Sequence, residues 1–253
     1  MLSSAALAAD EQPVLRWCLD HFPRFHEFHG VNQPIGASVD LMQELAKRVG
    51  FRIEYSPQIP LARCFKLIEN GEMDLITNLN KTPERAAFML MFPYSQSIPE
   101  AIYQRGDDHR AITQVNQLNR LTVATVRHYT YHPLVMRLIH DHAGKRLMEV
   151  DSIASGFETL AKGRVDALIV PRYSSLDYLH HTSRLHQQFK RAPLNLETDP
   201  PRFVYIGFSK KSRHPELADA ISRTLQQMMT DGTVRRLYAP DAKEVEQLVL
   251  VQL

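Results

Sequence analysis

The sequence predicts an α/β protein made of two lobes of similar build, each a mostly parallel sheet flanked by helices. Strand-like and helix-like segments alternate along the chain, which is typical of parallel sheets covered by helices. In two places a helix end is followed by a glycine, two further residues, an aspartate and a strand. These places hold Gly71 with Asp74 and Gly163 with Asp166. The recurrence indicates that the alternating plan occurs twice.

The first half of the chain contains three predicted strands and two predicted helices. Short apolar or alternating runs indicate the strands, which we place at 14–19, 51–55 and 74–77. The first helix follows Ser38, which we expect to cap it, and ends at Gly50, because glycine readily adopts the left-handed conformation of a helix end. The second helix spans 61–69 and ends before Gly71.

The second half repeats this order of elements. A strand is predicted at 121–126, and Pro133 begins a helix, since proline suits the first helical position. Ser155 and Glu158 have the spacing of a capping box in the next helix. A long amphipathic helix follows Pro215.

Two lobes without a flexible linker predict that extended segments join them. The expected connectors are 101–105 and 203–208. Lobe 1 is then discontinuous, with residues 10–102 and 206–253, and lobe 2 comprises residues 103–205. We expect a ligand cleft between the lobes, because ligands of open α/β sheets bind beyond the carboxyl ends of the strands.

Composition excludes several classes of function. The chain has 253 residues and a formal net charge of +2. Its basic residues are too few and too scattered for a nucleic-acid surface. No apolar run approaches the roughly 18 residues of a membrane-spanning helix. A globular protein that binds neither nucleic acid nor the bilayer interior is therefore expected.

The first residues and the two cysteines bear on the compartment. Residues 1–9 are small and apolar, and they read as the remnant of a signal peptide or as a disordered start. Export would permit a disulfide between Cys18 and Cys64. The sequence favours the alternative of two free, buried thiols, since Cys64 lies in the middle of a predicted helix and nothing directs it toward Cys18.

Several short motifs in a fixed order resemble the extracellular solute-binding proteins of family 3. These are type II periplasmic binding proteins, the two-lobed amino-acid receptors of ABC importers. The resemblance covers nearly the whole chain. The motifs are Phe22-Pro-Arg-Phe25, Gly36-x-x-Val-Asp-Leu41, Gly71-Glu-Met-Asp74, Thr82-Pro-Glu-Arg85, Phe92-Pro-Tyr-Ser95, Gly163-Arg-Val-Asp166 and Asp231-Gly232.

The resemblance implies a set of ligand-binding residues in lobe 1. Arg85 matches the arginine that binds the ligand carboxylate, and its planar guanidinium suits that task; the alternative is a surface ion pair. Asn78, Asn80 and Thr82 lie where the family places polar groups, although simple turn residues would look the same. Phe22 matches an aromatic residue that packs on the ligand, or it belongs to the core.

Two departures from the family pattern concern lobe 2. The strand that carries an acid for the ligand ammonium ends here in Pro171-Arg172. Arg127 stands where the family has a Gly-Thr pair. If Arg85, Arg127 and Arg172 all face the cleft, the ligand is more acidic than a neutral amino acid, such as a dicarboxylate. In the alternative, Arg127 and Arg172 point outward to solvent.

The expected function is that of a monomeric, periplasmic solute-binding protein that captures a small carboxylate-bearing metabolite for a membrane permease. One alternative is a ligand sensor that acts through a membrane partner. Another is an enzyme similar to cyclohexadienyl dehydratase, which needs an acid in the cleft. We expect no catalytic residue, no cofactor and no metal. Of the twelve histidines, His21, His26 and His29 lie close together in a predicted loop that is too irregular to fix a metal site, and we expect them to be solvated.

Overall fold

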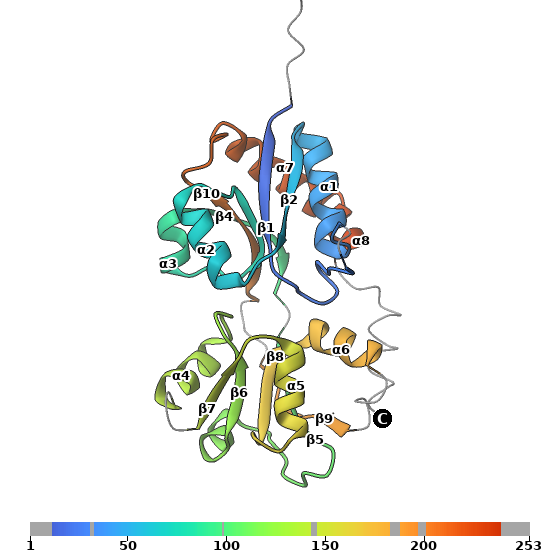
Figure 1. Cartoon of the computed structure of the whole chain (residues 1–253), viewed down its shortest axis with the longest axis vertical. Coiled ribbons are helices and arrows are strands. Elements are labelled where there is room, and N and C mark those ends of the chain that lie inside the picture. The colour runs from blue at the N-terminus through green and yellow to red at the C-terminus, as the bar shows by residue number, and fades with distance from the viewer. Residues whose placement is uncertain are drawn as a thin grey trace, which may run out of the picture.

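The computed structural model describes residues 12–30, 33–97, 99–142, 146–182, 188–196 and 201–238. Two α/β lobes stand one above the other, and each is built on a five-stranded sheet (Figure 1). The predicted signal-peptide remnant lies outside the described residues. Within them, no helix combines the length and apolar character needed to cross a bilayer.

The upper lobe, lobe 1, has a mixed sheet in the order β2-β1-β3-β10-β4. Its strands are β1 (Val14–Leu19), β2 (Arg52–Gln58), β3 (Leu75–Leu79), β4 (Met89–Gln96) and β10 (Phe203–Ser209). The first three are parallel, and β10 runs antiparallel to both of its neighbours. A strand from the distant C-terminal part of the chain therefore completes this sheet.

Lobe 2 has the same plan, with strand order β7-β6-β8-β5-β9. Its strands are β5 (Glu100–Arg105), β6 (Val123–Val126), β7 (Leu147–Val150), β8 (Ala167–Pro171) and β9 (Phe189–Arg191). The strands β6, β7 and β8 are parallel, and β5 is antiparallel to its neighbours. The predicted two-lobed α/β fold is confirmed, with mixed sheets.

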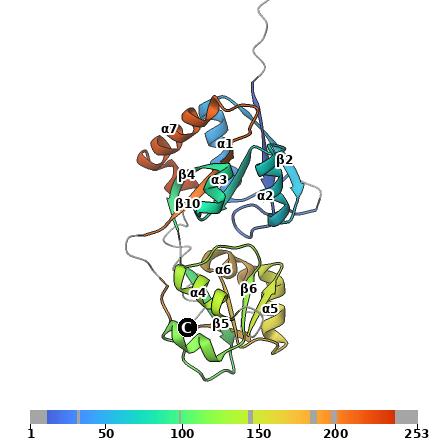
Figure 2. The ribbon, with the colours of Figure 1, turned by 90° about the vertical axis from the view of Figure 1, so that its left-hand side faces the viewer.

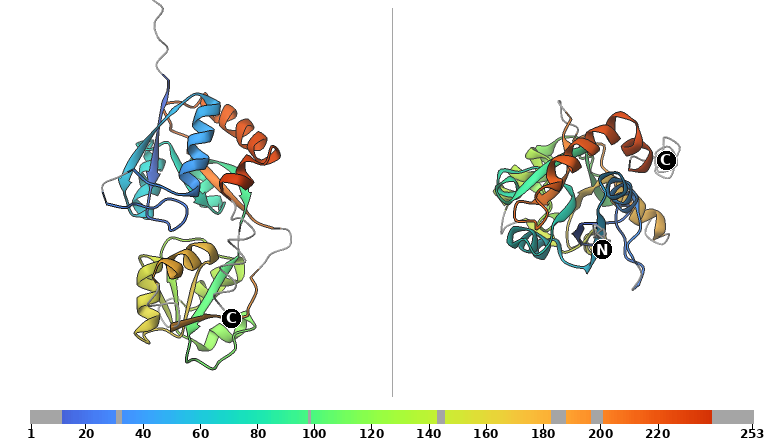
Figure 3. Two further views of the ribbon diagram at one scale, coloured as in Figure 1. Left: turned by 90° about the vertical axis from the view of Figure 1, so that its right-hand side faces the viewer. Right: turned by 90° about the horizontal axis from the view of Figure 1, so that it is seen from above.

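Helices cover both faces of each sheet. In lobe 1, α1 (Ala37–Val49) packs beside α7 (Leu217–Thr230) and α8 (Thr233–Leu237), as the left view of Figure 3 shows for the blue and red helices. The opposite face carries α2 (Leu61–Asn70) and α3 (Pro83–Phe88), which Figure 2 shows. Two hydrophobic clusters, one on each side of the sheet, form the core of this lobe.

Lobe 2 follows the same rule on a smaller scale. One face of its sheet packs on α5 (Ile153–Ala161) and α6 (Arg172–His181) through a cluster centred on Phe157. The other face packs on α4 (Pro133–His142) and the 3₁₀ helix Val115–Arg120. Each sheet thus has both faces covered, which explains why central strands such as β3 and β8 are almost fully buried.

The two aspartates of the repeated motif perform the same task in the two lobes. Asp74 accepts hydrogen bonds from the backbone N–H of Arg16 in β1 at 2.9 Å and from the Arg16 side chain at 2.9 Å. Asp166 accepts from the backbone N–H of Thr122, just before β6, at 2.8 Å and from Arg110 at 2.8 Å. Each carboxylate ties the start of its strand to the parallel strand beside it.

Two predicted helix caps were wrong. Gly36, with φ 125°, precedes α1, and an added Cβ there would lie 2.7 Å from the Arg24 carbonyl oxygen, so the chain enters the helix through a glycine. Ser38 lies inside the first turn, where its hydroxyl accepts a hydrogen bond from Asn78. In α5, the capping box pairs Ser152 with Ser155, because the helix begins earlier than its apolar pattern suggested.

The crossings between the lobes lie outside the expected connectors. The chain changes sheets between β4 and β5 and again between β9 and β10, so 101–105 and 203–208 lie within strands. Both crossings are held together where they pass each other. The Ser97 N–H donates to the Arg202 carbonyl at 2.7 Å, and the Arg202 guanidinium pairs with Glu100 at 3.0 Å.

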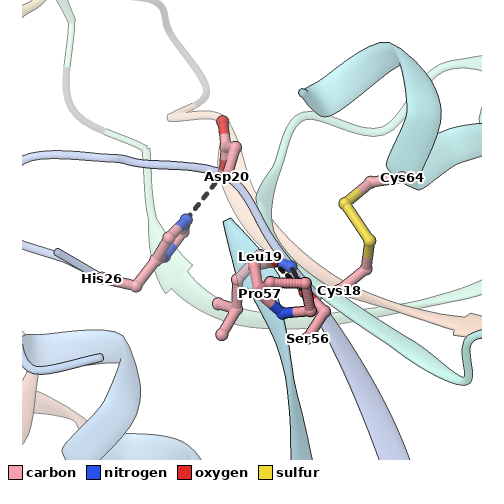
Figure 4. The surroundings of a disulfide bond; sticks show 7 residues. All are labelled: Cys18, Leu19, Asp20, His26, Ser56, Pro57 and Cys64. Carbon is pink, nitrogen blue, oxygen red and sulfur yellow. Dashed lines mark hydrogen bonds and ion pairs between the residues drawn. A yellow bond between two sulfur atoms is a disulfide. The ribbon is translucent and has the colours of Figure 1, made fainter. Parts of the chain in front are cut away.

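Cys18 and Cys64 form a disulfide, so the interpretation as free thiols was wrong (Figure 4). The bond joins β1 to α2 across a sequence separation of 46 residues, with the two Cα atoms 5.7 Å apart. Both cysteines are buried in the cluster beneath α2. The packing of α2 against β1 brings the two residues together, and that packing cannot be read from either cysteine's local sequence.

Candidate ligand-binding cleft

A cavity lies between the lobes and is lined by both of them. It holds about 850 Å³ of empty space, part of it open to solvent. Residues at the carboxyl ends of β3 and β8 form its walls, together with loops from each lobe. Its lining includes the side chains of Asp20, Phe22, His26, Asn78, Asn80, Arg85, Glu100, Tyr129 and Arg172.

Arg85 is buried in this cavity, with only 8% of its surface exposed. It stands in the first turn of α3, where its backbone N–H donates to the Thr82 hydroxyl at 3.3 Å. Thr82 itself does not line the cavity. Its role in the structure is to start the helix that carries Arg85, so this predicted ligand residue contributes through the cap.

The Arg85 guanidinium has neutral partners. Nη1 donates to the Asn80 carbonyl at 2.8 Å, Nη2 donates to the His128 carbonyl at 3.1 Å, and the group lies 4.7 Å from the centre of the Phe65 ring. Among the described residues no carboxylate pairs with it. Burial lowers the pKa of Arg85 to about 10, so it is a cation at neutral pH. Such a buried, unneutralised guanidinium suits a ligand carboxylate.

Asn78 lines the cavity, but its side chain is committed to the protein. Its amide oxygen accepts hydrogen bonds from the hydroxyls of Tyr94 at 2.8 Å and Tyr238 at 2.6 Å. Its amide nitrogen donates to Ser38 Oγ at 2.9 Å and to His26 Nδ1 at 3.2 Å. The backbone has φ 59°, a left-handed conformation that asparagine tolerates. Asn78 is therefore the centre of a buried polar network.

This network ends at a carboxylate in the cleft. Because Asn78 donates to Nδ1 of His26, the ring proton is assigned to Nε2, which donates to Asp20 at 2.8 Å. Asp20 was not among the predicted site residues. Asp20 directly follows β1, and the carboxyl end of a parallel strand faces the cleft. Its position after a predicted strand was therefore the signal by which the sequence could have revealed it.

Glu100 is the second cleft carboxylate that the sequence did not reveal. It is only 7% exposed, and its carboxylate is bound by other residues of the protein. It accepts a hydrogen bond from the His132 N–H at 2.8 Å and pairs with Arg202 at 3.0 Å. The adjacent positive charge of Arg202 leaves this carboxylate neutralised. It supports the crossing between the lobes.

Asn80 and Phe22, two of the predicted ligand-binding residues, line the cavity, and each contacts the opposite lobe. Asn80 Nδ2 donates to the Thr130 carbonyl at 2.6 Å. The Phe22 ring lies edge-on to Tyr129, with ring centres 5.8 Å apart. Together with the Arg85 bond to His128, these contacts join lobe 1 to the loop between β6 and α4.

The structure decides which of the two arginines in lobe 2, Arg127 and Arg172, faces the cleft. Arg127 is exposed, does not line the cavity and pairs with Asp151 at 3.1 Å. Arg172 lines the cavity as the first residue of α6. Its Nε atom is buried and has no hydrogen-bond partner within the described part of the chain. Of the predicted pair, only Arg172 contributes a charge to the cleft.

The histidines offer no alternative metal centre in the parts of the chain that are described, where no group of three potential ligands converges. In the loop that holds His21, His26 and His29, His26 is only 2% exposed. Both of its ring nitrogens are hydrogen-bonded. The prediction of solvated loop histidines was therefore wrong for His26, which is a buried part of the polar network.

The chain is similar to binding proteins in sequence and in structure. The glutamate-binding protein GluB of Corynebacterium glutamicum is 28% identical over 187 residues, which cover 73% of this chain and 61% of that protein. A solved amino acid ABC transporter substrate-binding protein from Streptococcus pneumoniae, bound to L-arginine, has a TM-score of 0.73 at 20% identity and covers 94% of this chain and 95% of its own.

A histidine kinase sensor domain with similarity to periplasmic binding proteins has a TM-score of 0.76 at 18% identity, and the match covers 90% of this chain and 95% of that one. At such identities the solved structures show the shared fold alone. The model of the bacterial extracellular solute-binding proteins, family 3, matches residues 15–240, which is most of the chain. The chain therefore belongs to the family 3 bacterial extracellular solute-binding proteins.

Proposed function

We propose that this protein is a periplasmic receptor that captures an amino acid by its carboxylate and delivers it to an ABC importer. The observation that carries the proposal is the Arg85 guanidinium, which is buried in the cleft and has no carboxylate partner among the described residues. A ligand carboxylate would supply the missing negative charge. Membership of the family of extracellular solute-binding proteins supports delivery to an importer.

In this mechanism lobe 1 presents Arg85, and lobe 2 closes over the ligand. The loop between β6 and α4 already contacts Arg85, Asn80 and Phe22, so it would form the closing surface. Rotation would occur at the two crossings between the sheets, next to the Glu100–Arg202 pair. The closed form is the state that a membrane partner would recognise.

Sensing through a membrane partner uses the same capture step and differs only in the protein that recognises the closed form. Catalysis makes a different prediction, because an enzyme converts the ligand. Asp20 and Glu100 place carboxylates in the cleft, but both are engaged by neighbouring residues. Recovery of the bound amino acid unchanged after prolonged incubation would favour capture over catalysis.

Replacement of Arg85 by methionine tests the proposal. We expect amino-acid affinity, measured by calorimetry, to fall by a free energy of about 3 kcal/mol, because a charged partner of the carboxylate is lost. Arg85→Lys keeps the charge without the planar fork and should bind with intermediate affinity. Arg63→Met, which removes an exposed arginine of α2, is the matched control and should bind normally. Unchanged affinity in folded Arg85→Met would overturn the proposal.

A further inference from the structure

The charges that line the cleft define a ligand more narrowly than Arg85 alone does. Among the described residues, the formally charged side chains of the lining are Asp20, Arg85, Glu100 and Arg172. Glu100 is neutralised by Arg202, which lies 3.0 Å away. His26 carries one ring proton in the assigned network and leaves the charge of Asp20 in place. Two cations and one anion therefore face the cavity, a net charge of +1.

Arg172 gives the lobe 2 wall its positive charge. No described carboxylate pairs with it, and its buried Nε lacks a hydrogen-bond partner within the described residues. Arg85 stands on the opposite lobe. The cavity thus lies between two separate guanidinium groups, and neither has a carboxylate partner in the described part of the chain.

Resting on the proposed function, we infer that the ligand is an acidic amino acid, with one carboxylate on Arg85, the second on Arg172 and the ammonium toward Asp20. A molecule with two carboxylates and one ammonium has a net charge of −1, which complements the lining. A neutral amino acid leaves the Arg172 guanidinium without a counter-charge. A basic amino acid adds a further cation to a site that is already positive. Both alternatives are electrostatically unfavourable.

The positions of the two arginines indicate a ligand with a second carboxylate, which a neutral amino acid lacks. The second carboxylate of the ligand would lie in lobe 2, where the family pattern places an acid and this chain has Pro171-Arg172. Asp20 is fixed by His26, so the ammonium would be bound from lobe 1. Recognition of side-chain charge and closure of the lobes would thereby be coupled, since the two carboxylates of the ligand would be bound by arginines of different lobes.

Calorimetry with a panel of ligands tests the inference. The panel is L-glutamate, L-aspartate, L-glutamine, L-asparagine, L-arginine and glutarate. We expect L-glutamate or L-aspartate to bind about 30-fold or more tightly than its own amide. Glutarate, which lacks the ammonium, should bind more weakly than L-glutamate. Tighter binding of an amide or of L-arginine would overturn the inference.

Arg172→Met should remove most of the preference for the acid over the amide, and Arg172→Gln provides a second variant if the first fails to fold. Arg127→Met is the matched control, because Arg127 is an arginine of the same lobe that points outward and pairs with Asp151. A preference that persists in both Arg172 variants would contradict the assignment.

The outcomes for the two proposals are distinct. If no amino acid binds, or if Arg85→Met binds normally, the proposed function fails. If L-glutamine or L-arginine binds with full dependence on Arg85 while the acidic amino acids do not, only the inference about ligand class fails. If the acidic amino acids bind and both Arg85 and Arg172 are required, both proposals are supported.

Discussion

Two asparagines at the carboxyl end of β3, Asn78 within the strand and Asn80 just after it, show how position decides the role of a residue. Asn78 and Asn80 are two residues apart, and both line the cleft. Asn78 turns inward through a left-handed backbone conformation and bonds Tyr94, Tyr238, Ser38 and His26. Asn80 faces lobe 2 and bonds the Thr130 carbonyl. The first holds lobe 1 together, and the second contacts its partner lobe.

Asn78→Ala should reduce the free energy of unfolding by about 3 kcal/mol. The change leaves the buried hydroxyl groups of Tyr94 and Tyr238 without their acceptor. It also places alanine, which tolerates a positive φ less well than asparagine, in a left-handed backbone conformation. Urea denaturation would measure the change. Asn70→Ala is the control, since Asn70 is exposed and bonds Glu72. A change below 1 kcal/mol for Asn78→Ala would show that the network contributes little.

At the scale of elements, the repeated Gly-x-x-Asp motif fastens parallel strands. The glycine, Gly71 in lobe 1, ends the helix in a left-handed conformation, and the aspartate that follows opens the strand. Burial alone would raise the pKa of Asp74, but hydrogen bonds from the Arg16 side chain, its backbone N–H and Ser212 outweigh it and lower that pKa. The charged carboxylate is therefore favoured in the folded state.

Asp74→Asn should lose about 3 kcal/mol of stability at neutral pH, because it removes the charged partner of Arg16. Because the pKa of Asp74 is lower in the folded state, its charged carboxylate stabilises the protein at pH values above the ordinary aspartate pKa of 3.8. This contribution is lost as the pH falls through the pKa that Asp74 has in the folded protein. The difference in unfolding free energy between wild type and Asp74→Asn should accordingly narrow below about pH 4. Denaturant titrations at several pH values would measure it.

Asp107→Asn provides the control for this pH series, since Asp107 is an exposed aspartate whose ion pair with Arg105 spans 3.6 Å. It should leave stability nearly unchanged at every pH. A constant difference between wild type and Asp74→Asn across the pH range would be inconsistent with the assignment of the stabilising charge to Asp74.

At the scale of the whole molecule, three contacts close the cleft from one loop of lobe 2. Arg85 donates to the His128 carbonyl, Asn80 donates to the Thr130 carbonyl, and Phe22 packs on Tyr129. Because each contact uses a lobe 1 residue that lines the cleft, ligand capture and lobe closure share the same side chains. The crossings, fastened by Glu100 and Arg202, lie beside this cleft.

Asn80→Ala should shift the ligand-free protein toward an open form. The loss of one hydrogen bond between the lobes is worth about 1 kcal/mol, or about fivefold in the ratio of closed to open molecules. Small-angle X-ray scattering would detect a larger radius of gyration, and the stability of lobe 1 should change little. Arg127→Met leaves these contacts intact and should scatter as wild type. Equal radii for Asn80→Ala and wild type would argue against this role.

Local patterns account for what was predicted correctly. Apolar periodicity, helix-ending glycines such as Gly50 and the repeated aspartates each depend on residues close in sequence, and they defined the two α/β lobes. The Thr-x-x-Arg motif and its resemblance to the family directed attention to Arg85, which lines the cavity and whose role in ligand binding stays a prediction. The Cys18–Cys64 bond, the buried His26 and the sheet crossings depend on residues far apart in the chain. No local pattern specifies those neighbours.

The sequence by itself determined the alternating elements, the two-lobed plan and the arginine at the start of α3, because each is encoded within a few consecutive residues. Only the tertiary structure decided which charges share the cleft. Arg127 and Arg172 both follow strands of lobe 2, yet one pairs with Asp151 at the surface and the other faces the cavity. The packing of two lobes sets that choice, since a side chain's surroundings come from distant parts of the chain.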